Sequence, residues 1–127
     1  MYKPFHLIGL ELGMSVLSAA LRREPTGQSC GFRGDVVSVA KRALRAGETL
    51  DGEGGFTVWG KLVPAERSLS QGALPIGLAH KVALLRDIAA GEIVSWADVE
   101  IPDTEAVRAR REMERRFAAL PSAIAAQ

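Results

Sequence analysis

The stretch KRALRAGETLDGEGG, residues 41–55, has a counterpart 44 positions further along the chain, LRDIAAGEIVSWADV at residues 85–99. Both copies carry the pattern Arg-x-aliphatic-x-Ala-Gly-Glu. Glycine in a turn adopts left-handed backbone angles without steric cost, and the Glu after it can accept hydrogen bonds or pair with a nearby base. The repeat therefore predicts two equivalent turns. The matched positions are Arg42 and Arg86, Leu44 and Ile88, Ala46 and Ala90, Gly47 and Gly91, Glu48 and Glu92, and Leu50 and Val94.

Aliphatic, β-branched residues precede and follow each of these turns. Residues 35–44, DVVSVAKRAL, place valines in near alternation with other residues, which predicts a strand that leads into the turn at residues 46–47. In the second copy, aliphatic residues between 82 and 88 lead into the turn at residues 90–91. Ile93, Val94 and Val99 lead away from that turn. We therefore expect a short strand on either side of each turn.

The connection between the two copies is rich in Gly and Pro. Residues 56–63, FTVWGKLV, predict a strand, and residues 65–72, AERSLSQG, predict a helical turn that ends at Gly72. A long connection between similar strands typically wraps a compact β body or builds a site. Together with helices predicted near both ends of the chain, these segments indicate an α+β fold.

Composition limits both the size and the partners of this protein. The chain has 127 residues, of which 47% are hydrophobic, enough for one ordinary domain with one core. Its net charge of +1 supplies no long-range field that would attract nucleic acid or an anionic membrane. The single cysteine, Cys30, cannot form an internal disulfide, which fits a cytoplasmic protein.

Residues 7–21, LIGLELGMSVLSAAL, form an apolar stretch with the outline of a secretory signal peptide. Glu11 in its middle and the single lysine before it, Lys3, favour a helix instead. The large apolar residues lie on two sides of that helix, whereas a surface helix has one apolar side. We therefore expect the helix to need a partner, and to end near Arg22 and Arg23 ahead of Pro25.

A second helix is predicted for residues 103–120, with Asp103 or Thr104 as its cap. Arginines and acids four residues apart predict a solvated face with ion pairs, such as that of Arg110 with Glu114. The opposite, apolar face consists of Ala106, Ala109, Met113, Phe117 and Leu120.

The repeat and its surroundings resemble a known module. Residues 39–55 and 77–101 are similar to a SAF domain, the β-clip module of sialic acid synthases, type III antifreeze proteins, flagellar P-ring assembly chaperones and altronate dehydratases. The chain also resembles, in several segments that follow in order, the C-terminal region of bacterial oxidoreductases related to homoserine dehydrogenase, including a branch like deoxyxylulose phosphate reductoisomerase. Those segments are YKPFHLIGLELGMSVLSAALRREPTG (2–27), DGEGGFTVWGKLVP (51–64), LPIGLAH (74–80) and REMERRF (111–117).

This resemblance implies three segments: an N-terminal docking helix and linker at 1–26, a SAF-like β-clip with short twisted strands at 35–101, and a C-terminal helix at 103–120. The larger oxidoreductases bind NAD(P) in a Rossmann unit. The present chain has no strand, G-x-G-x-x-G and helix in succession, so we expect no cofactor in it. The nearest glycine cluster, DGEGGF at 51–56, forms a turn or cradles an anion with its backbone amides.

Five residues are candidates for a ligand site: Arg42, Glu48, His80, Arg86 and Glu92. The alternative for the Arg and Glu pairs is purely architectural, because short Gly-Glu turns often join aliphatic segments. His80 either lines the concave side of the clip or is an ordinary hydrogen-bonded residue. His6 and His80 lack metal-ligand spacing, and no nucleophile motif is present, so we expect neither a metal nor catalytic residues in this chain. Trp59 and Trp96 are either platforms for a sugar or packing residues.

Two functional hypotheses follow. The first is a non-catalytic domain of, or partner to, an NAD(P)-dependent oxidoreductase resembling homoserine dehydrogenase, which docks, oligomerises or completes a substrate site. It predicts homo-oligomers or contact with an upstream dehydrogenase domain or subunit. The second is an autonomous module that binds a sugar, a polyol or a sugar acid. Neither hypothesis involves nucleic acid or a membrane, and an enzyme complete in this chain is not expected.

Overall fold

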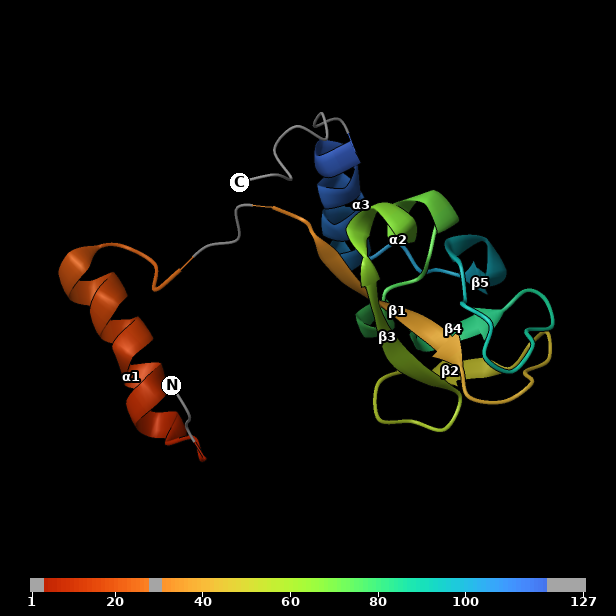
Figure 1. Cartoon of the computed structure of the whole chain (residues 1–127), viewed down its shortest axis with the longest axis horizontal. Coiled ribbons are helices and arrows are strands. Elements are labelled where there is room, and N and C mark those ends of the chain that lie inside the picture. Colours follow the sequence, from red (N-terminus) through yellow and green to blue (C-terminus); the bar gives the residue numbers. More distant parts are fainter. Residues whose placement is uncertain (1–3, 28–30, 119–127) are drawn as a thin grey trace. The chain divides into compact units, whose positions relative to one another are not determined.

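The computed structural model describes residues 4–27 and 31–118 and divides into two units, Met1–Cys30 (unit 1) and Gly31–Gln127 (unit 2) (Figure 1). Unit 1 contains α1 (Ile8–Leu17), which continues as a π-helical turn over Ser18–Arg22. Unit 2 contains β1 (Gly34–Ala40), β2 (Thr49–Asp51), β3 (Val58–Pro64), α2 (Ala65–Gln71), β4 (His80–Leu84), β5 (Val99–Glu100) and α3 (Glu105–Ala118). The expectation of an α+β fold with a helix towards each end is confirmed.

Two small antiparallel sheets form the centre of unit 2. β1 pairs with β3 in one register, from Gly34 opposite Pro64 to Ala40 opposite Val58. In the second sheet β4 lies between β2 and β5. The predicted strand within residues 56–63 is therefore β3, and the predicted helical turn at 65–72 is α2, whose last turn is followed by Gly72 in the left-handed conformation.

The two copies of the repeat are related by approximate two-fold symmetry. At the centre, Leu44 and Ile88 exchange backbone hydrogen bonds, each N–H donating to the other's carbonyl over 2.9 Å. Further out, the Ala40 N–H donates to Glu92 O, and its counterpart, the Leu84 N–H, donates to Glu48 O, both over 2.9 Å. Each half therefore supplies strands that complete the other half.

The predicted turns occupy the predicted places. Gly47 and Gly91 have φ angles of +84° and +80°, in the region that favours glycine. Their N–H groups also correspond, because Gly47 donates to Leu84 O over 2.7 Å and Gly91 to Ala40 O over 2.9 Å.

The strand predicted for residues 35–44 is shorter in the structure. β1 ends at Ala40, and Lys41 and Arg42 form a bend. Leu44 then makes an isolated bridge to Ile88. The bend exists because the chain must turn inward for Leu44 to reach the two-fold centre.

Most of the core of unit 2 lies around this centre. Leu44, Leu50, Leu74 and Ile88 are the largest side chains that are fully buried. The main cluster comprises Ala40, Leu44, Leu50, Val58, Leu74, Ala79, Val82, Leu84, Ile88, Val94 and Val99, and a smaller one comprises Val37, Val39, Val63 and Ala73.

α3 contacts the rest of unit 2 through arginines as well as through Phe117, whose ring centre lies 6.2 Å from that of Phe32, which corrects part of the prediction for this helix. Ala106 and Ala109, assigned to the apolar face, are exposed. The side chains of Arg110 and Glu114, assigned to the solvated face, are only 14% and 13% exposed. On the predicted apolar face, Met113 and Phe117 are half-buried, and Leu120 lies outside the described residues.

A buried carboxylate explains the orientation of α3. Asp35 in β1 accepts hydrogen bonds from Arg110 Nη1 and Nη2, over 3.1 and 2.6 Å, and from Ser68 Oγ over 2.5 Å. The Arg110 guanidinium also lies 5.0 Å from the centre of the Phe32 ring. A buried carboxylate needs such partners, so the helix presents its arginine rather than its alanines to the strand.

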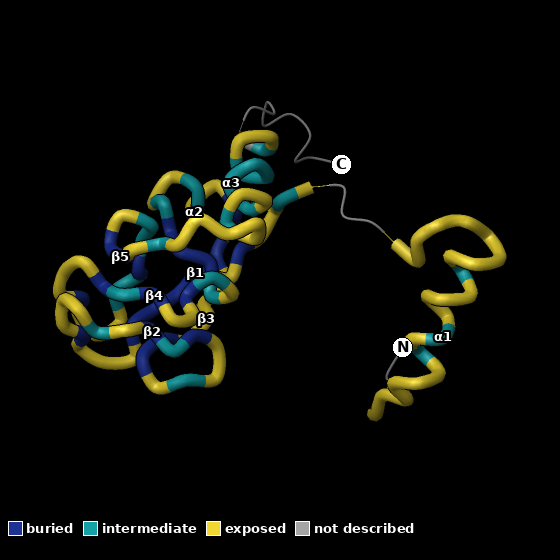
Figure 2. The backbone as a smooth tube through the Cα atoms, turned by 180° about the vertical axis from the view of Figure 1, so that it is seen from behind, coloured by how far each residue is buried: buried dark blue, intermediate teal, exposed yellow. Residues whose placement is uncertain are grey.

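Unit 1 has the opposite character. No residue of α1 is buried, and Figure 2 colours the helix as exposed along most of its length. Its large apolar side chains, which the sequence analysis placed on two sides of the helix, are exposed, with fractions up to 76% at Ile8 and, just beyond α1, 77% at Leu21. Among the described residues, none of the helices has both the length and the apolar character that crossing a bilayer requires.

Candidate functional site

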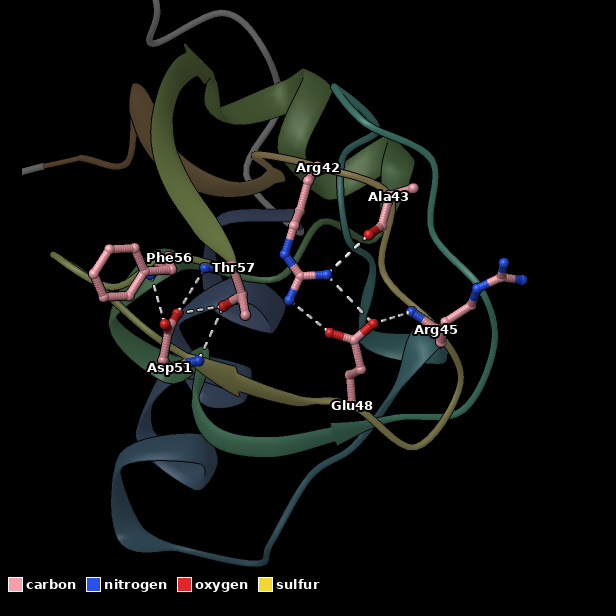
Figure 3. Close-up of polar contacts among 7 residues, drawn as sticks. All are labelled: Arg42, Ala43, Arg45, Glu48, Asp51, Phe56 and Thr57. Carbon is pink, nitrogen blue, oxygen red and sulfur yellow. Dashed lines mark hydrogen bonds and ion pairs between the residues drawn. The ribbon is translucent and has the colours of Figure 1, made fainter.

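The first turn, residues 42–48, is closed by an arginine and a glutamate (Figure 3). Arg42 Nη2 donates to Glu48 Oε2 over 2.7 Å, and Arg42 Nη1 donates to Ala43 O over 3.0 Å. Glu48 Oε1 accepts a hydrogen bond of 2.7 Å from the Arg45 N–H. The glutamate therefore holds the backbone of the turn, and the arginine holds the glutamate.

The second turn, residues 86–92, repeats these three hydrogen bonds. Arg86 Nη2 donates to Glu92 Oε1 over 2.8 Å, and Arg86 Nη1 donates to Asp87 O over 2.9 Å. Glu92 accepts a hydrogen bond of 2.9 Å from the Ala89 N–H. The same residue types at the same spacing thus build the same hydrogen bonds twice.

The second turn has one partner that the first lacks. Arg86 Nε donates over 2.6 Å to Asp98 Oδ1. Asp98 is buried, and its other oxygen accepts from the N–H and the hydroxyl of Ser95 over 2.7 and 2.8 Å. The guanidinium of Arg86 is therefore engaged on three sides.

The charges of these groups follow from their partners. The Arg42 guanidinium, followed by the Arg45 N–H, lowers the pKa of Glu48. The Ala89 N–H, followed by Arg86, lowers the pKa of Glu92. Burial raises the pKa of Asp98, but Arg86 and Ser95 outweigh it and leave the pKa below its ordinary value. All three carboxylates are ionised at neutral pH and suit structural pairing better than proton transfer.

His80 lies apart from both pairs. It begins β4, opposite Asp51, and its Nδ1 lies 2.9 Å from Asp51 O. Its ring packs against Gly52, where an added Cβ would come within 3.1 Å of the imidazole. In the part of the chain that the structure describes, no hydrogen bond or ion pair joins His80 to the two arginine–glutamate pairs, so the five candidates do not form one cluster.

The glycine-rich loop at 51–56 is closed by a carboxylate of this chain. Asp51 accepts hydrogen bonds from the Phe56 N–H over 2.5 Å, from the Thr57 N–H over 3.0 Å, and from the Thr57 hydroxyl (Figure 3). Thr57 and Phe56 lower the pKa of Asp51 to about 2. Of the loop amides that the sequence offered for an external anion, the Phe56 N–H thus binds Asp51, and the Gly55 N–H donates to Gly52 O over 3.2 Å.

The loop also requires Gly55, because a Cβ there would overlap the Asp51 carboxyl group. Sequence reasoning missed this role of Asp51. The available signal was the aspartate at the start of a glycine-rich loop, because aspartate side chains often accept hydrogen bonds from nearby backbone N–H groups in turns.

The two tryptophans differ in their surroundings. Trp96 is half-buried, and the Arg111 guanidinium lies 3.7 Å from the centre of a Trp96 ring. Trp59 is 44% exposed on β3. His6, which the sequence left without a role, lies 3.2 Å from Glu11 at the start of α1. Over residues 4–27 and 31–118, no three His, Cys, Asp or Glu side chains gather where they could hold a metal ion.

Comparison with known proteins gives no family for this chain, since neither a protein-family model nor a curated protein matches it.

Proposed function

We propose that this chain is a non-catalytic, SAF-like domain that works through docking, either within an NAD(P)-dependent oxidoreductase resembling homoserine dehydrogenase or as a cytoplasmic partner of one. The family assignment rests on the sequence resemblance. The docking role rests on one observation, the exposure of α1 and the turn after it.

That exposure is unusual for a helix of a water-soluble chain. The polar positions of the helix form only a narrow strip, Glu11, Ser15 and Ser18. Burying a large aliphatic side chain stabilises a protein by about 1.5–3 kcal/mol, so covering both apolar sides would supply a strong driving force for association. The large apolar residues exposed in this segment are Leu7, Ile8, Leu10, Leu12, Met14, Val16, Leu17 and Leu21.

The geometry of the candidate site supports a non-catalytic role. Arg42 and Arg86 are each paired with the glutamate of their own turn, and each glutamate holds a backbone N–H of the same turn. Groups used in this way stabilise the turns and supply no free acid or base near neutral pH.

The test is the solution mass of the full chain, measured by light scattering over a wide concentration range, for the wild type and for Leu10→Glu/Met14→Glu. We expect the wild type to associate and the double variant to have a lower mass at the same concentration, because both substitutions place charge on one apolar side of α1. The matched control, Ser15→Glu, adds charge on the polar strip and should associate like the wild type. An equal mass for wild type and double variant would contradict docking through α1.

A further inference from the structure

One edge of β3 has no partner strand in the described part of the chain. β3 pairs with β1 on one side only. The Ser38 N–H donates to Leu74 O over 2.8 Å and the Ala40 N–H to Glu92 O over 2.9 Å, so both residues direct their backbone groups away from β3. In an antiparallel pair, the residues opposite them, Gly60 and Val58, must then direct their backbone groups away from β1.

The same alternation places Leu62 at the open edge. The N–H and C=O groups of Val58, Gly60 and Leu62 thus form a row along the outer side of β3, and no hydrogen bond to another described residue involves them. The next outward position is Pro64, which has no N–H and ends the row. Unpaired groups in such a row are a template for another strand.

Three large side chains in the middle of β3 are exposed, whereas Val58 at its start is buried. Leu62 is 72% exposed on one face of β3, and Trp59 and Lys61 are exposed on the other. We propose that β3 pairs with β3 of a second copy of this chain, antiparallel and centred on Gly60, to form a continuous four-stranded sheet.

The register of the proposed pair follows from which backbone N–H groups can find an acceptor and from the charges that face each other. A two-fold axis at Gly60 sets Gly60 opposite its own copy and Val58 opposite Leu62, so all three outward N–H groups find an acceptor. An axis at Leu62 would place Gly60 opposite Pro64, which lacks a donor. An axis at Lys61 would set two like charges directly opposite each other.

The Gly60 register also pairs the side chains favourably. It places Lys61 of one copy opposite Trp59 of the other, twice, in the closely spaced kind of antiparallel pair. An ammonium group beside an indole face is attractive, and the alkyl stem of the lysine covers apolar ring surface. Lysine on a strand edge usually discourages pairing. Here the second copy supplies it with a partner.

Cysteine cross-linking tests this register in the full chain. In a Cys30→Ala background, one preparation carries Trp59→Cys and another carries Lys61→Cys. Mixed and gently oxidised with diamide, they should form a disulfide-linked dimer, because positions 59 and 61 of different copies lie about 4.5 Å apart between Cα atoms. Each preparation alone should cross-link far less, because equal positions lie diagonally, about 8 Å apart. Equal cross-linking in all three samples, or none, would overturn the proposal.

A second pair of variants leaves the side chains of that contact intact. Leu62→Pro removes the outward N–H but no hydrogen bond to β1, whereas Leu62→Ala shortens the side chain and keeps the N–H. We expect the proline to weaken association through β3 about ten-fold more than the alanine, because the symmetric pair loses that bond twice. Similar dimer affinities for the two would contradict the strand pairing.

This proposal is independent of docking through α1. Both tests are repeated in the Leu10→Glu/Met14→Glu background, where pairing through β3 should persist. Cross-linking that disappears in this background would assign the contact to α1 and overturn the strand pairing without affecting the proposed docking role.

Discussion

The two turns of unit 2 start alike and continue differently. Both place an arginine, a buried aliphatic residue, a left-handed glycine and a glutamate at the same spacing, and both form the same hydrogen bonds. After the glutamate, the first turn leads through β2 into the loop held by Asp51. The second leads into a short helical turn in which Ser95 and Asp98 cap each other and Asp98 binds Arg86.

The approximate symmetry is also broken inside the turns. Asp87 of the second turn corresponds to Ala43 of the first. Its carboxylate accepts hydrogen bonds from the Ala46 N–H over 2.8 Å and from Arg45 Nη1 over 3.1 Å, so the second turn holds the first. The hydrogen bonds that both turns share thus form the symmetric part of the structure. The hydrogen bonds of Asp87 are asymmetric, because they run from the first turn to the second and have no counterpart in the opposite direction within the described residues.

The largest effect is expected at the two-fold centre. Leu44→Asp and Ile88→Asp should each unfold unit 2, since a buried, unpaired carboxylate in place of a core side chain costs ~4 kcal/mol or more. The symmetry predicts similar losses for both. Tryptophan fluorescence during urea unfolding measures them, because both tryptophans lie in unit 2. Leu85→Asp, at an exposed leucine nearby, is the control, and a large loss at only one of the two central positions would break the symmetry argument.

The loop of the first half should be sensitive at a single glycine. Gly55→Ala is expected to destabilise unit 2 by about 2–3 kcal/mol, because its Cβ overlaps the Asp51 carboxyl and displaces the hydrogen bonds that close the loop. Gly54→Ala is the matched control. Gly54 has a φ of +77° but open space around it, so only the backbone term of about 1 kcal/mol applies. Equal losses in urea unfolding would mean that Asp51 does not close the loop.

The two arginines should differ although their turns match. Arg86→Ala leaves the buried Asp98 without its cation, a loss of about 1–2 kcal/mol, whereas Arg42→Ala only opens an exposed pair and should lower the unfolding midpoint less. Thermal unfolding at pH 7 compares the stabilities of the two variants.

The same folded variants, titrated with a panel of sugars, polyols and sugar acids, test the ligand-binding alternative. That alternative requires measurable affinity in the wild type and its loss in the variants.

The sequence was sufficient where one local pattern decides the structure. Gly47 and Gly91 have the expected left-handed backbone. The strand within residues 56–63 and the helical turn at 65–72 could also be predicted, because hydrophobic periodicity and glycine are local signals. The end of β1 was misjudged because the bend at residues 41–42 depends on Leu44 reaching Ile88, a contact between distant parts of the chain.

The orientation of α3 shows a second limit. A helical periodicity counts alanines as apolar and arginines as solvated, but it cannot show that Asp35, 75 positions away, is buried and needs Arg110. The sequence-based prediction of the candidate site had the same limit. The pattern identified Arg42, Glu48, Arg86 and Glu92 correctly as equivalent pairs, but only the three-dimensional structure shows that each glutamate is held by the arginine of its own turn.

A smaller change in stability, this time a gain, is expected at a position where the first half has a polar residue and the second half an apolar one. Ser38 corresponds to Val82, and its hydroxyl is buried with no hydrogen-bond partner in the described residues. Ser38→Ala should stabilise unit 2 by about 1 kcal/mol, because the unsatisfied hydroxyl no longer has to leave water. Ser68→Ala is the contrasting variant, since the Ser68 hydroxyl donates to Asp35 and its loss should destabilise. Urea midpoints that fall for both would show that Ser38 has a partner.

The smallest expected difference between the two halves is the pH dependence of their stability. Asp51 can ionise in the first half, whereas Ser95, at the equivalent position in the second half, cannot. The pKa of Asp51 falls from an ordinary value of 3.8 to about 2 in the folded chain. A carboxyl group with a depressed folded pKa stabilises the fold above its unfolded pKa, and this contribution is lost as the pH falls through the folded value. The stability difference between wild type and Asp51→Asn should therefore narrow between about pH 4 and pH 2. Urea unfolding at a series of pH values measures that difference, and a constant gap down to pH 2 would show that the charge of Asp51 does not hold the loop.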